Sequence, residues 1–371
     1  VALPGQDVYY EYRSLEIARY IEEHPEYSRI VIALSGDAGF YSGAKGLLKL
    51  LDKNTEVICG ISSVVYFMSK IGLSWDDAKI VSAHGRKCNL VSLIRTNQKV
   101  FAILGTADGA ANLAEKLTEY GMGDVMLYVG ENLSYATEKI FVKQAKDLTD
   151  YRGDALSVIC AWNPDAKAAR TTHGLPDEAF IRGKAPMTKT EVRTVSLAKL
   201  CLEEDSVCYD IGAGTGSVSV EMALRADQGE VYAIEKKEDA LELLKENKKK
   251  FALDHMQIIP GTAPEAMEGL PVPTHAFIGG SSGNMKDIVE LLQKKNPQVR
   301  IVINCITLET VGEALSCIKE MQTEQSEWTW ETEVVQLGVA RSREIGRYHM
   351  MMGENPIYII TIQAHKKEKK V

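Results

Sequence analysis

Three glycines stand at every second position in the stretch DIGAGTG, where an apolar run passes into a helix-like run. Gly212, Gly214 and Gly216 let the backbone approach a ligand at distances that a Cβ atom would prevent. Glu235 ends the next apolar run, EVYAIE, about 20 residues after the last glycine. A carboxylate there can accept hydrogen bonds from both ribose hydroxyls of an adenosine-containing cofactor. The alternative is a tight strand-to-helix turn that binds no ligand.

Asp210, two positions before the first glycine, bears on which cofactor is bound. The dinucleotide pattern G-x-G-x-x-G directs a helix N-terminus at a pyrophosphate. A carboxylate beside the loop would repel a pyrophosphate, whereas it could receive the ammonium group of a methionine. The pattern therefore favours S-adenosylmethionine over NAD, with NAD kept as the alternative.

A second strand, glycine turn and helix pattern lies near the start of the chain, in ALSGDAGFYSGAKGLLKLL. Ser35, Gly36 and Asp37 at its turn are candidate cofactor-binding residues, and a purely structural turn is the alternative. His84 in SAHGR is a weak candidate for a base near this turn, or a structural histidine at a strand end. Arg86, in the same stretch, is a weak candidate for binding substrate.

Basic side chains gather in ARSREIGRYHMMMGENP, residues 340–356. They could bind the carboxylates of an acidic substrate while the three methionines meet its apolar face. The alternative is an ordinary solvated hairpin loop whose methionines pack into the hydrophobic core. The candidate substrate-binding residues of this stretch are Arg341, Arg343, Arg347 and His349.

Lys189 and Arg193, in the stretch APMTKTEVR, are similar candidates for binding substrate and weak candidates for catalysis. The alternative is that both charges form local ion pairs at the start of a helix.

Composition excludes several classes of protein. The chain has 371 residues, of which 45% are hydrophobic and 25% charged, as in ordinary globular proteins. Its net charge of −8 gives no support to a nucleic-acid or anionic-membrane partner. Seven scattered cysteines, without a CxxC pair or a Cys/His cluster, indicate buried thiols rather than disulfides or a metal site. With no apolar run near the roughly 20 residues of a membrane span and no signal peptide, we expect a cytoplasmic protein.

Apolar runs alternate with amphipathic helical runs twice along the chain, which is typical of parallel α/β sheets. We expect a first domain at residues 1–162, a linker rich in Pro, Gly and charge at 163–185, and a second domain at 186–371. The last two apolar runs have no helix between them, which predicts an antiparallel terminal hairpin. In the first domain the expected strands cover residues 29–36, 56–61, 78–85, 99–106, 124–130 and 155–162.

The second domain resembles the Rossmann-like class I methyltransferases, and more closely the decarboxylating C15-methyltransferases of corrin biosynthesis. The resemblance rests on APMTKTEVR, DIGAGTGSVSVE, VYAIEKKEDALELL, GTAPEAM, FIGGSSGNMKDIVE and NCITLETVGEAL, in family order. It implies S-adenosylmethionine as cofactor, held by the loop from Gly212 to Gly216, including Ala213 and Thr215, and by Thr188, Glu235 and Ala263. Thr262 stands where the family usually has an acidic residue, so the family's side-chain contact to the adenine amino group is not carried over.

The first domain resembles the tetrapyrrole (class III) methylases of the cobalt-precorrin C5-methyltransferase type, through GDAGFYSG, CGISSV, VSAHGR and GENLSY. Family members open with a strand and a G-x-G-P-G turn, and this chain is expected to lack that strand. Together the two halves resemble the fused precorrin-6Y C5,15-methyltransferases (decarboxylating) of cobalamin biosynthesis. The resemblance implies methyl transfer to C5 and C15 of a tetrapyrrole, loss of carbon dioxide from the C12 acetate, and a homo-oligomer formed through the second domain.

Three other functions stay open from the sequence. A methyltransferase could act on another small molecule, on protein or on RNA, although no basic stretch interleaved with aromatic residues supports RNA. An NAD-dependent oxidoreductase is the second possibility. A scaffold without activity is the third, and it applies to the first domain alone.

Overall fold

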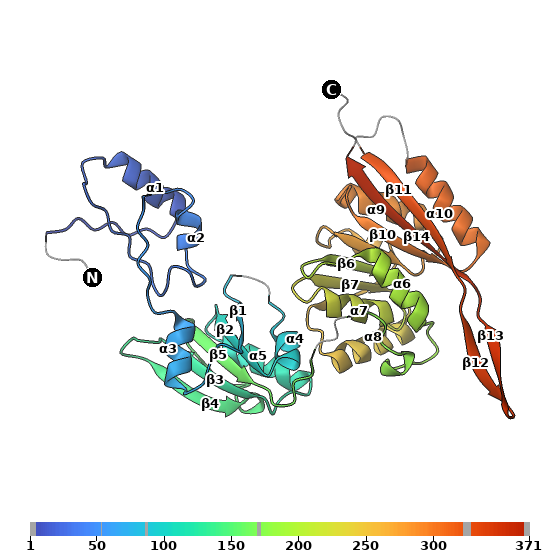
Figure 1. Cartoon of the computed structure of the whole chain (residues 1–371), viewed down its shortest axis with the longest axis horizontal. Coiled ribbons are helices and arrows are strands. Elements are labelled where there is room, and N and C mark those ends of the chain that lie inside the picture. The colour runs from blue at the N-terminus through green and yellow to red at the C-terminus, as the bar shows by residue number, and fades with distance from the viewer. Residues whose placement is uncertain (1–4, 53, 86–87, 169–171, 322–327, 367–371) are drawn as a thin grey trace, which may run out of the picture. The chain divides into compact units, whose positions relative to one another are not determined.

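The computed structural model describes residues 5–52, 54–85, 88–168, 172–321 and 328–366 (Figure 1). The chain divides into two compact units. Unit 1 is drawn from Val1–Cys88 and Asn97–Asp165, and unit 2 from Asn89–Thr96 and Ala166–Val371. Among the described helices, none is long and apolar enough to cross a membrane.

Unit 1 contains a sheet whose described strands run in the order β1-β2-β5-β3-β4. β1 and β2 are parallel, and every other neighbouring pair is antiparallel. Phe67 and Phe101 are fully buried in its core. The elements are α1 (Ser14–Glu23), α2 (Ala44–Leu47), α3 (Ser63–Lys70), β1 (Lys79–Ser82), β2 (Lys99–Leu104), α5 (Gly109–Glu119), β3 (Met126–Glu131), β4 (Lys139–Gln144), η1 (Ala145–Asp147) and β5 (Ser157–Trp162).

Two predicted strands of unit 1 are absent from the described structure. Residues 29–36 and 56–61 form no ladder, and Val31 and Ile58 are 79% and 81% exposed. A segment rich in β-branched residues becomes a strand only where a neighbouring strand forms hydrogen bonds with its backbone. Neither segment has such a neighbouring strand among the described residues. The prediction also missed β4, an edge strand that pairs with β3 alone and carries little buried surface.

Unit 2 contains a sheet whose described strands run in the order β11-β14-β10-β9-β6-β7-β8. The strands from β10 to β8 in this order are parallel, and β14 is antiparallel to β10 and β11. The elements are α4 (Leu90–Thr96), η2 (Asp177–Ala179), α6 (Thr190–Leu200), β6 (Val207–Ile211), α7 (Ser217–Arg225), β7 (Glu230–Glu235), α8 (Glu238–Phe251), β8 (Met256–Pro260), η3 (Glu265–Met267), β9 (His275–Ile278), α9 (Met285–Lys295), β10 (Arg300–Cys305), α10 (Leu308–Met321), β11 (Trp328–Leu337), β12 (Ala340–Ile345), β13 (Tyr348–Gly353) and β14 (Ile357–Lys366).

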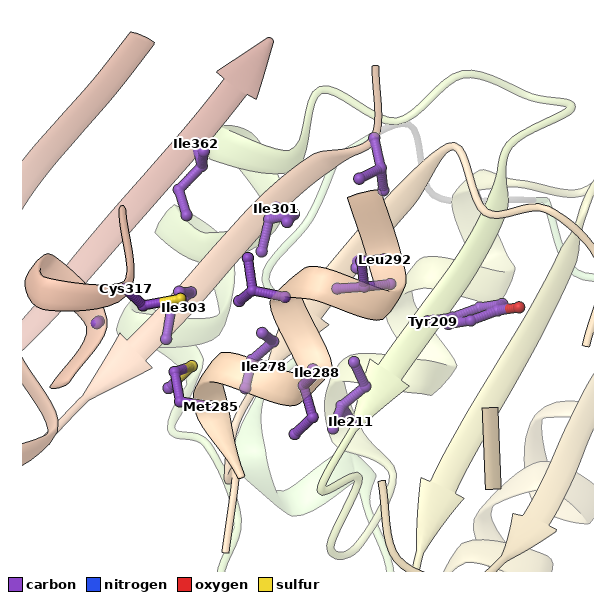
Figure 2. Packing of buried hydrophobic residues seen from close by; sticks show 14 of the residues in the cluster. Tyr209, Ile211, Ile278, Met285, Ile288, Leu292, Ile301, Ile303, Cys317 and Ile362 are labelled. Carbon is purple, nitrogen blue, oxygen red and sulfur yellow. The ribbon is translucent and has the colours of Figure 1, made fainter. Parts of the chain in front are cut away.

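Helices cover both faces of the unit 2 sheet, and the alternation of strand residues decides which face each side chain meets. Tyr209 and Ile211 of β6 belong to the core cluster that contains buried residues of α9 and α10. Figure 2 shows this cluster, with Ile288 and Leu292 of α9 over the strands. Cys208, between the two β6 residues, belongs to the opposite cluster, which contains buried residues of α6, α7 and α8.

The antiparallel terminal pair is confirmed, since β11 and β14 pair along their whole length. The stretch between them is more ordered than the predicted loop, because β12 and β13 form an exposed two-stranded antiparallel ribbon. The predicted linker also differs in its second part. Leu175 packs against the core of unit 2, where Phe180 is buried, and Asp177 is 7% exposed.

Candidate functional site

A pocket of about 450 Å³ lies at the carboxyl ends of the parallel strands of unit 2. Loops that follow β6, β7, β8 and β9 contribute to its wall, and β10 and β14 contribute residues from the other side. In open α/β sheets this edge is the usual place for a ligand, because the loops after successive parallel strands converge there.

The glycine loop after β6 is packed too tightly for side chains. Gly212 has a φ of +76°, and a Cβ added to it would lie 2.8–3.1 Å from backbone atoms of Gly280. A Cβ on Gly214, at a φ of +56°, would lie 2.8 Å from the carbonyl oxygen of Pro186. The glycines therefore let the loops after β6 and β9 and the segment before α6 meet around the pocket.

Glu235 lines the pocket at the end of β7 and holds the glycine loop in place. Its Oε2 accepts a hydrogen bond from the Gly214 N–H at 2.8 Å. Its Oε1 accepts from the backbone N–H groups of Lys236 and Lys237 at 2.8 and 2.9 Å. A carboxylate offers about four lone-pair directions, so these three bonds leave acceptor capacity for a ligand hydroxyl.

Asp210 lies elsewhere than the sequence predicted. It belongs to β6, its side chain is 1% exposed, and it is not among the residues that line the pocket. Strand alternation directs it toward α7, where its Oδ2 accepts from the Ser219 hydroxyl. Burial raises the pKa of the Asp210 carboxyl to about 7. A direct contact between this carboxylate and the ammonium group of the cofactor is therefore withdrawn.

The raised pKa makes Asp210 a source of pH-dependent stability. The folded chain holds this proton up to about pH 7, whereas the carboxyl's ordinary pKa is 3.8. The contribution of Asp210 to the free energy of unfolding should therefore fall as the pH rises through this window. Asp210→Asn cannot ionise, so we expect its stability relative to the wild type to rise by about 4 kcal/mol between about pH 4 and about pH 8.

Urea unfolding at several pH values measures this difference. Asp205→Asn, at an exposed position that precedes β6, is the matched control and should show no such trend. An unchanged difference between Asp210→Asn and the wild type across the window would contradict a protonated Asp210.

The other predicted cofactor residues of unit 2 divide into two groups. Thr188, Ala213 and Ala263 line the pocket together with Gly212, Gly214 and Glu235. Thr215 and Gly216 do not line it. Thr215 is 1% exposed beneath the loop, and Gly216 is the N-cap of α7, with a φ of +79°.

Arg193 is a structural residue and is withdrawn as a substrate-binding or catalytic candidate. Its side chain is fully buried and pairs with Glu221 at 2.6 Å and with Asp177 at 3.3 Å. Its guanidinium also lies over the Phe180 ring. Lys189 does line the pocket, and its Nζ lies 3.7 Å from Asp177.

The predicted basic stretch falls on the β12–β13 ribbon, which presents its members on different faces. Arg341 and Arg343 pair with Met352 and Met350 across the ribbon and so share one face. His349 pairs with Glu344 and lies on the other face. Arg347 is in the turn between the strands. The four basic residues therefore do not form a single clamp on one face.

Arg341 ties the base of the ribbon to the pocket. Its Nε donates to Glu354 at 2.9 Å, and Glu354 lines the pocket. Its second terminal nitrogen donates to Glu191, in the first turn of α6. The hydrogen bond that Arg341 donates to the Glu354 carboxylate raises the pKa of its guanidinium further above the usual range.

In unit 1, Asp37 organises the predicted glycine turn. Its carboxylate accepts from the N–H groups of Gly39 at 2.8 Å and Gly60 at 3.3 Å, so it joins two loops beside a hollow of about 380 Å³. Ser35 and Gly36 are not among the residues that line this hollow. His84 lines a neighbouring hollow together with Lys45. Arg86 lies outside the described residues.

Several pocket residues were not singled out from the sequence as site residues. Some follow the rule that residues at the end of each parallel strand reach the same edge, and that rule was applied only to β6 and β7. Others come from the segment before α6 and from the chain between β11 and the start of β14, to which the rule does not apply. Together they include Met187, Lys236, Gly279, Gly280, Ser281, Ser282, Asn304, Ile306, Val339, Glu354, Asn355 and Ile357.

Two protein families match this chain. Residues 178–364 match the family described as the precorrin methyltransferase domain. Residues 11–149 match the tetrapyrrole (corrin/porphyrin) methylases. Both matches confirm the resemblances expected from the sequence motifs.

The chain is similar to a probable cobalt-precorrin-6B C(15)-methyltransferase (decarboxylating) of Pyrobaculum calidifontis, at 40% identity over 196 residues, which are 52% of this chain and 97% of that protein. The chain is also 35% identical over 194 residues to the cobalt-precorrin-6B C(15)-methyltransferase (decarboxylating) of Salmonella typhimurium. These residues are 52% of this chain and 97% of that protein. A solved precorrin-6Y C5,15-methyltransferase structure from Geobacter metallireducens is 34% identical, with a TM-score of 0.48, and the match covers 52% of this chain and 98% of that one.

Proposed function

The chain belongs to the precorrin methyltransferase family and is an S-adenosylmethionine-dependent methyltransferase, and on this premise we propose that unit 2 methylates C15 of a tetrapyrrole. In the same site it removes the C12 acetate carboxyl as carbon dioxide. The substrate is a precorrin or a cobalt-precorrin, in cobalamin biosynthesis. The names of the similar proteins over the C-terminal half support this substrate class.

The pocket at the carboxyl ends of β6 to β10 carries this proposal. When bound, S-adenosylmethionine supplies a methyl group on a cationic sulfonium. The residues present fit this cofactor, because the bare glycine loop admits close approach and Glu235 keeps free acceptor capacity at the pocket wall. We propose Gly212, Ala213, Gly214, Glu235, Thr188 and Ala263 as its binding residues.

Methyl transfer from a sulfonium is an in-line displacement, so the protein has to align the accepting carbon and exclude water. No protein nucleophile is required. The pocket continues past the glycine loop to β10 and β14, with the apolar side chains Ile306, Val339 and Ile357. These side chains support an apolar binding surface for part of the macrocycle next to the cofactor.

We propose that unit 1 methylates C5 of the same tetrapyrrole with a second S-adenosylmethionine. The match of residues 11–149 to the tetrapyrrole methylases supports this activity. Ser35, Gly36 and Asp37 remain the proposed cofactor residues there, and His84 a proposed base.

The product formed from a precorrin-6-stage tetrapyrrole tests both activities. The whole chain is incubated without oxygen with S-adenosylmethionine and either the metal-free or the cobalt-loaded substrate, and the product mass is measured. Two methyl groups gained and one carbon dioxide lost are expected. One methyl gained with carbon dioxide lost would contradict the activity of unit 1, and an unchanged mass would contradict the proposed acceptor.

We propose that Arg341 and Arg347 contribute to substrate binding, in place of a clamp of all four basic residues. We expect Arg341→Ala with Arg347→Ala to weaken tetrapyrrole binding about tenfold. Loss of Arg347 removes a guanidinium that can contact a substrate carboxylate. Loss of Arg341 removes the cation that balances Glu354 and Glu191 at the pocket, so acidic side chains there would repel the substrate. Fluorescence titration with the tetrapyrrole and calorimetric titration with S-adenosylmethionine measure the two affinities separately.

Affinity for S-adenosylmethionine should stay unchanged in this double variant. Equal loss of both affinities would indicate misfolding and contradict the role in substrate binding. Arg343→Ala is the comparison, because Arg343 is exposed on the same face of the ribbon as Arg341. It shows whether the loss of any positive charge on the ribbon has the same effect.

We also propose a cytoplasmic location and a homo-oligomer formed through unit 2. Free cysteines in both units support a reducing compartment. Ile345, Tyr348 and Met350, all exposed on one face of the β12–β13 ribbon, support an apolar contact with another copy.

A further inference from the structure

Lys189 immediately precedes α6 and lines the pocket of unit 2. We propose that its ammonium group binds a carboxylate of a ligand in this pocket, and that it leaves Asp177 to do so. The carboxylate belongs either to the methionine part of the cofactor or to a side chain of the tetrapyrrole. This inference rests on the proposed function of unit 2.

Asp177, the anionic partner of Lys189 in the structure, already has closer partners. The Lys189 Nζ lies 3.7 Å from the Asp177 Oδ2. Arg182 and Arg193 each lie 3.3 Å from this carboxylate, and the hydroxyl of Thr190 donates to it at 2.9 Å. The carboxylate therefore keeps two cations and one hydroxyl donor when Lys189 moves away.

The charge balance of this cluster is also complete without Lys189. Asp177 and Glu221 are its buried carboxylates, and the two arginines supply two positive charges for them. Arg182 has a second, weaker partner in Glu178, which is 4.0 Å away and 84% exposed. The positive charge of Lys189 is therefore more than the buried carboxylates need.

The ammonium group of Lys189 keeps its donors available. A lysine ammonium carries three N–H donors, and 3.7 Å is too long for a hydrogen bond to Asp177. No hydrogen bond joins the Lys189 Nζ to any residue in the described part of the chain. The side chain is 45% exposed, so a ligand can reach it.

The pocket itself favours an anion. Within the described structure, its ionisable lining residues are Lys189, Lys236, Lys237, Glu235 and Glu354. Glu354 pairs with Arg341 at 2.9 Å, and Glu235 accepts hydrogen bonds from three backbone N–H groups. The cations of the lining therefore outnumber the carboxylates, and the pocket attracts a negatively charged group.

The position of α6 decides which part of a ligand reaches Lys189. The helix packs on β10 and β14, and Val192 in its first turn lines the pocket as well. Lys189 therefore lies toward the β10 side of the pocket, whereas Glu235 lies at the end of β7. The ribose of the cofactor is proposed at Glu235, so a carboxylate at Lys189 comes from the methionine end or from the macrocycle.

Lys189→Met tests the proposal, because it removes the charge and the donors but keeps the length of the side chain. Calorimetric titration with S-adenosylmethionine and fluorescence titration with the precorrin-6-stage tetrapyrrole measure the two affinities of the full chain. We expect one of the two affinities to fall by about tenfold or more, since a hydrogen bond between charged groups is lost. Lys189→Arg should restore most of the loss.

Decarboxylated S-adenosylmethionine distinguishes the two sources of the carboxylate. If the methionine carboxylate is the partner, Lys189→Met weakens binding of S-adenosylmethionine and leaves binding of the decarboxylated compound unchanged. If a tetrapyrrole side chain is the partner, only the affinity for the tetrapyrrole falls. Either result supports the proposal and names the ligand.

Lys184→Met is the matched control, because Lys184 is exposed in the same segment and does not line the pocket. It should leave both affinities unchanged. Urea unfolding should give the same midpoint for Lys189→Met and the wild type, since Asp177 keeps its other partners.

Unchanged affinity for both ligands in Lys189→Met would overturn the proposal. Equal weakening of S-adenosylmethionine and its decarboxylated form would also overturn it, because the effect would then not depend on a carboxylate. A lower urea midpoint together with loss of both affinities would make Lys189 a structural partner of Asp177. Failure of the wild type to bind the tetrapyrrole would contradict the proposed acceptor instead, and the cofactor titrations alone would then decide for or against the role of Lys189.

Discussion

Replacing Arg193 with methionine is expected to lower the free energy of unfolding by about 3–5 kcal/mol, because it leaves buried carboxylates without their cation. Glu221 is 3% exposed and Asp177 7% exposed. Burial opposes ionisation of Asp177, but a hydrogen bond from Thr190 and the charge of Arg193 hold its pKa below the usual value. Urea unfolding measures the loss.

The same substitution should loosen the segment that leads into α6. Glu221 also accepts from the N–H groups of Gly174 and Leu175, at 2.8 and 3.1 Å, so the ion pair anchors this segment to α7. Arg182→Met is the matched control, since Arg182 also pairs with Asp177 but its side chain is 41% exposed. That change should cost less than about 1 kcal/mol. Similar losses in the two variants would contradict the role assigned to the buried pair.

Gly212→Ala should both destabilise unit 2 and strongly weaken cofactor binding. The added Cβ meets backbone atoms of Gly280 at 2.8–3.1 Å, and the φ of +76° is itself unfavourable for alanine. We expect a loss of about 2 kcal/mol or more in the free energy of unfolding. Displacement of the loop should weaken S-adenosylmethionine binding by about a hundredfold or more.

Gly269→Ala is the matched control for this change. A Cβ on Gly269 meets nothing within 4 Å, its backbone is outside the positive-φ region, and it does not line the pocket. Both its stability and its cofactor affinity should stay close to the wild type. Unimpaired cofactor binding by Gly212→Ala, measured by calorimetric titration, would show that the cofactor does not lie against this loop.

The parts of the site that could be predicted are those that depend on residues close together in the sequence. The glycine loop and Glu235 belong to adjacent strands of a parallel sheet, so their spacing alone places them at one edge. The face of the sheet on which the Asp210 side chain lies depends on where β6 ends. A shift of one residue in the strand would move this side chain from the pocket to the core. The sequence pattern placed it at the strand tip, and the structure places it beneath α7.

The residues that could not be predicted depend on partners far along the chain. Arg193 meets Glu221 from another helix, 28 positions away, and no local pattern contains that pair. Asn304 lines the pocket and lies 3.0 Å from the hydroxyl of Ser196, 108 positions earlier. The two missing strands of unit 1 show the same limit, since residues 29–36 have strand composition but no neighbouring strand among the described residues.

The central claim is that unit 2 couples methylation at C15 to loss of the C12 carboxyl. The most direct test is the amount of carbon dioxide released per methyl group gained at C15, measured with methyl-labelled S-adenosylmethionine and carbon NMR of the product. The wild-type chain should release one carbon dioxide for each labelled methyl at C15, and none when S-adenosylmethionine is omitted. Labelled C15 methyl without carbon dioxide, or carbon dioxide without S-adenosylmethionine, would contradict the coupling.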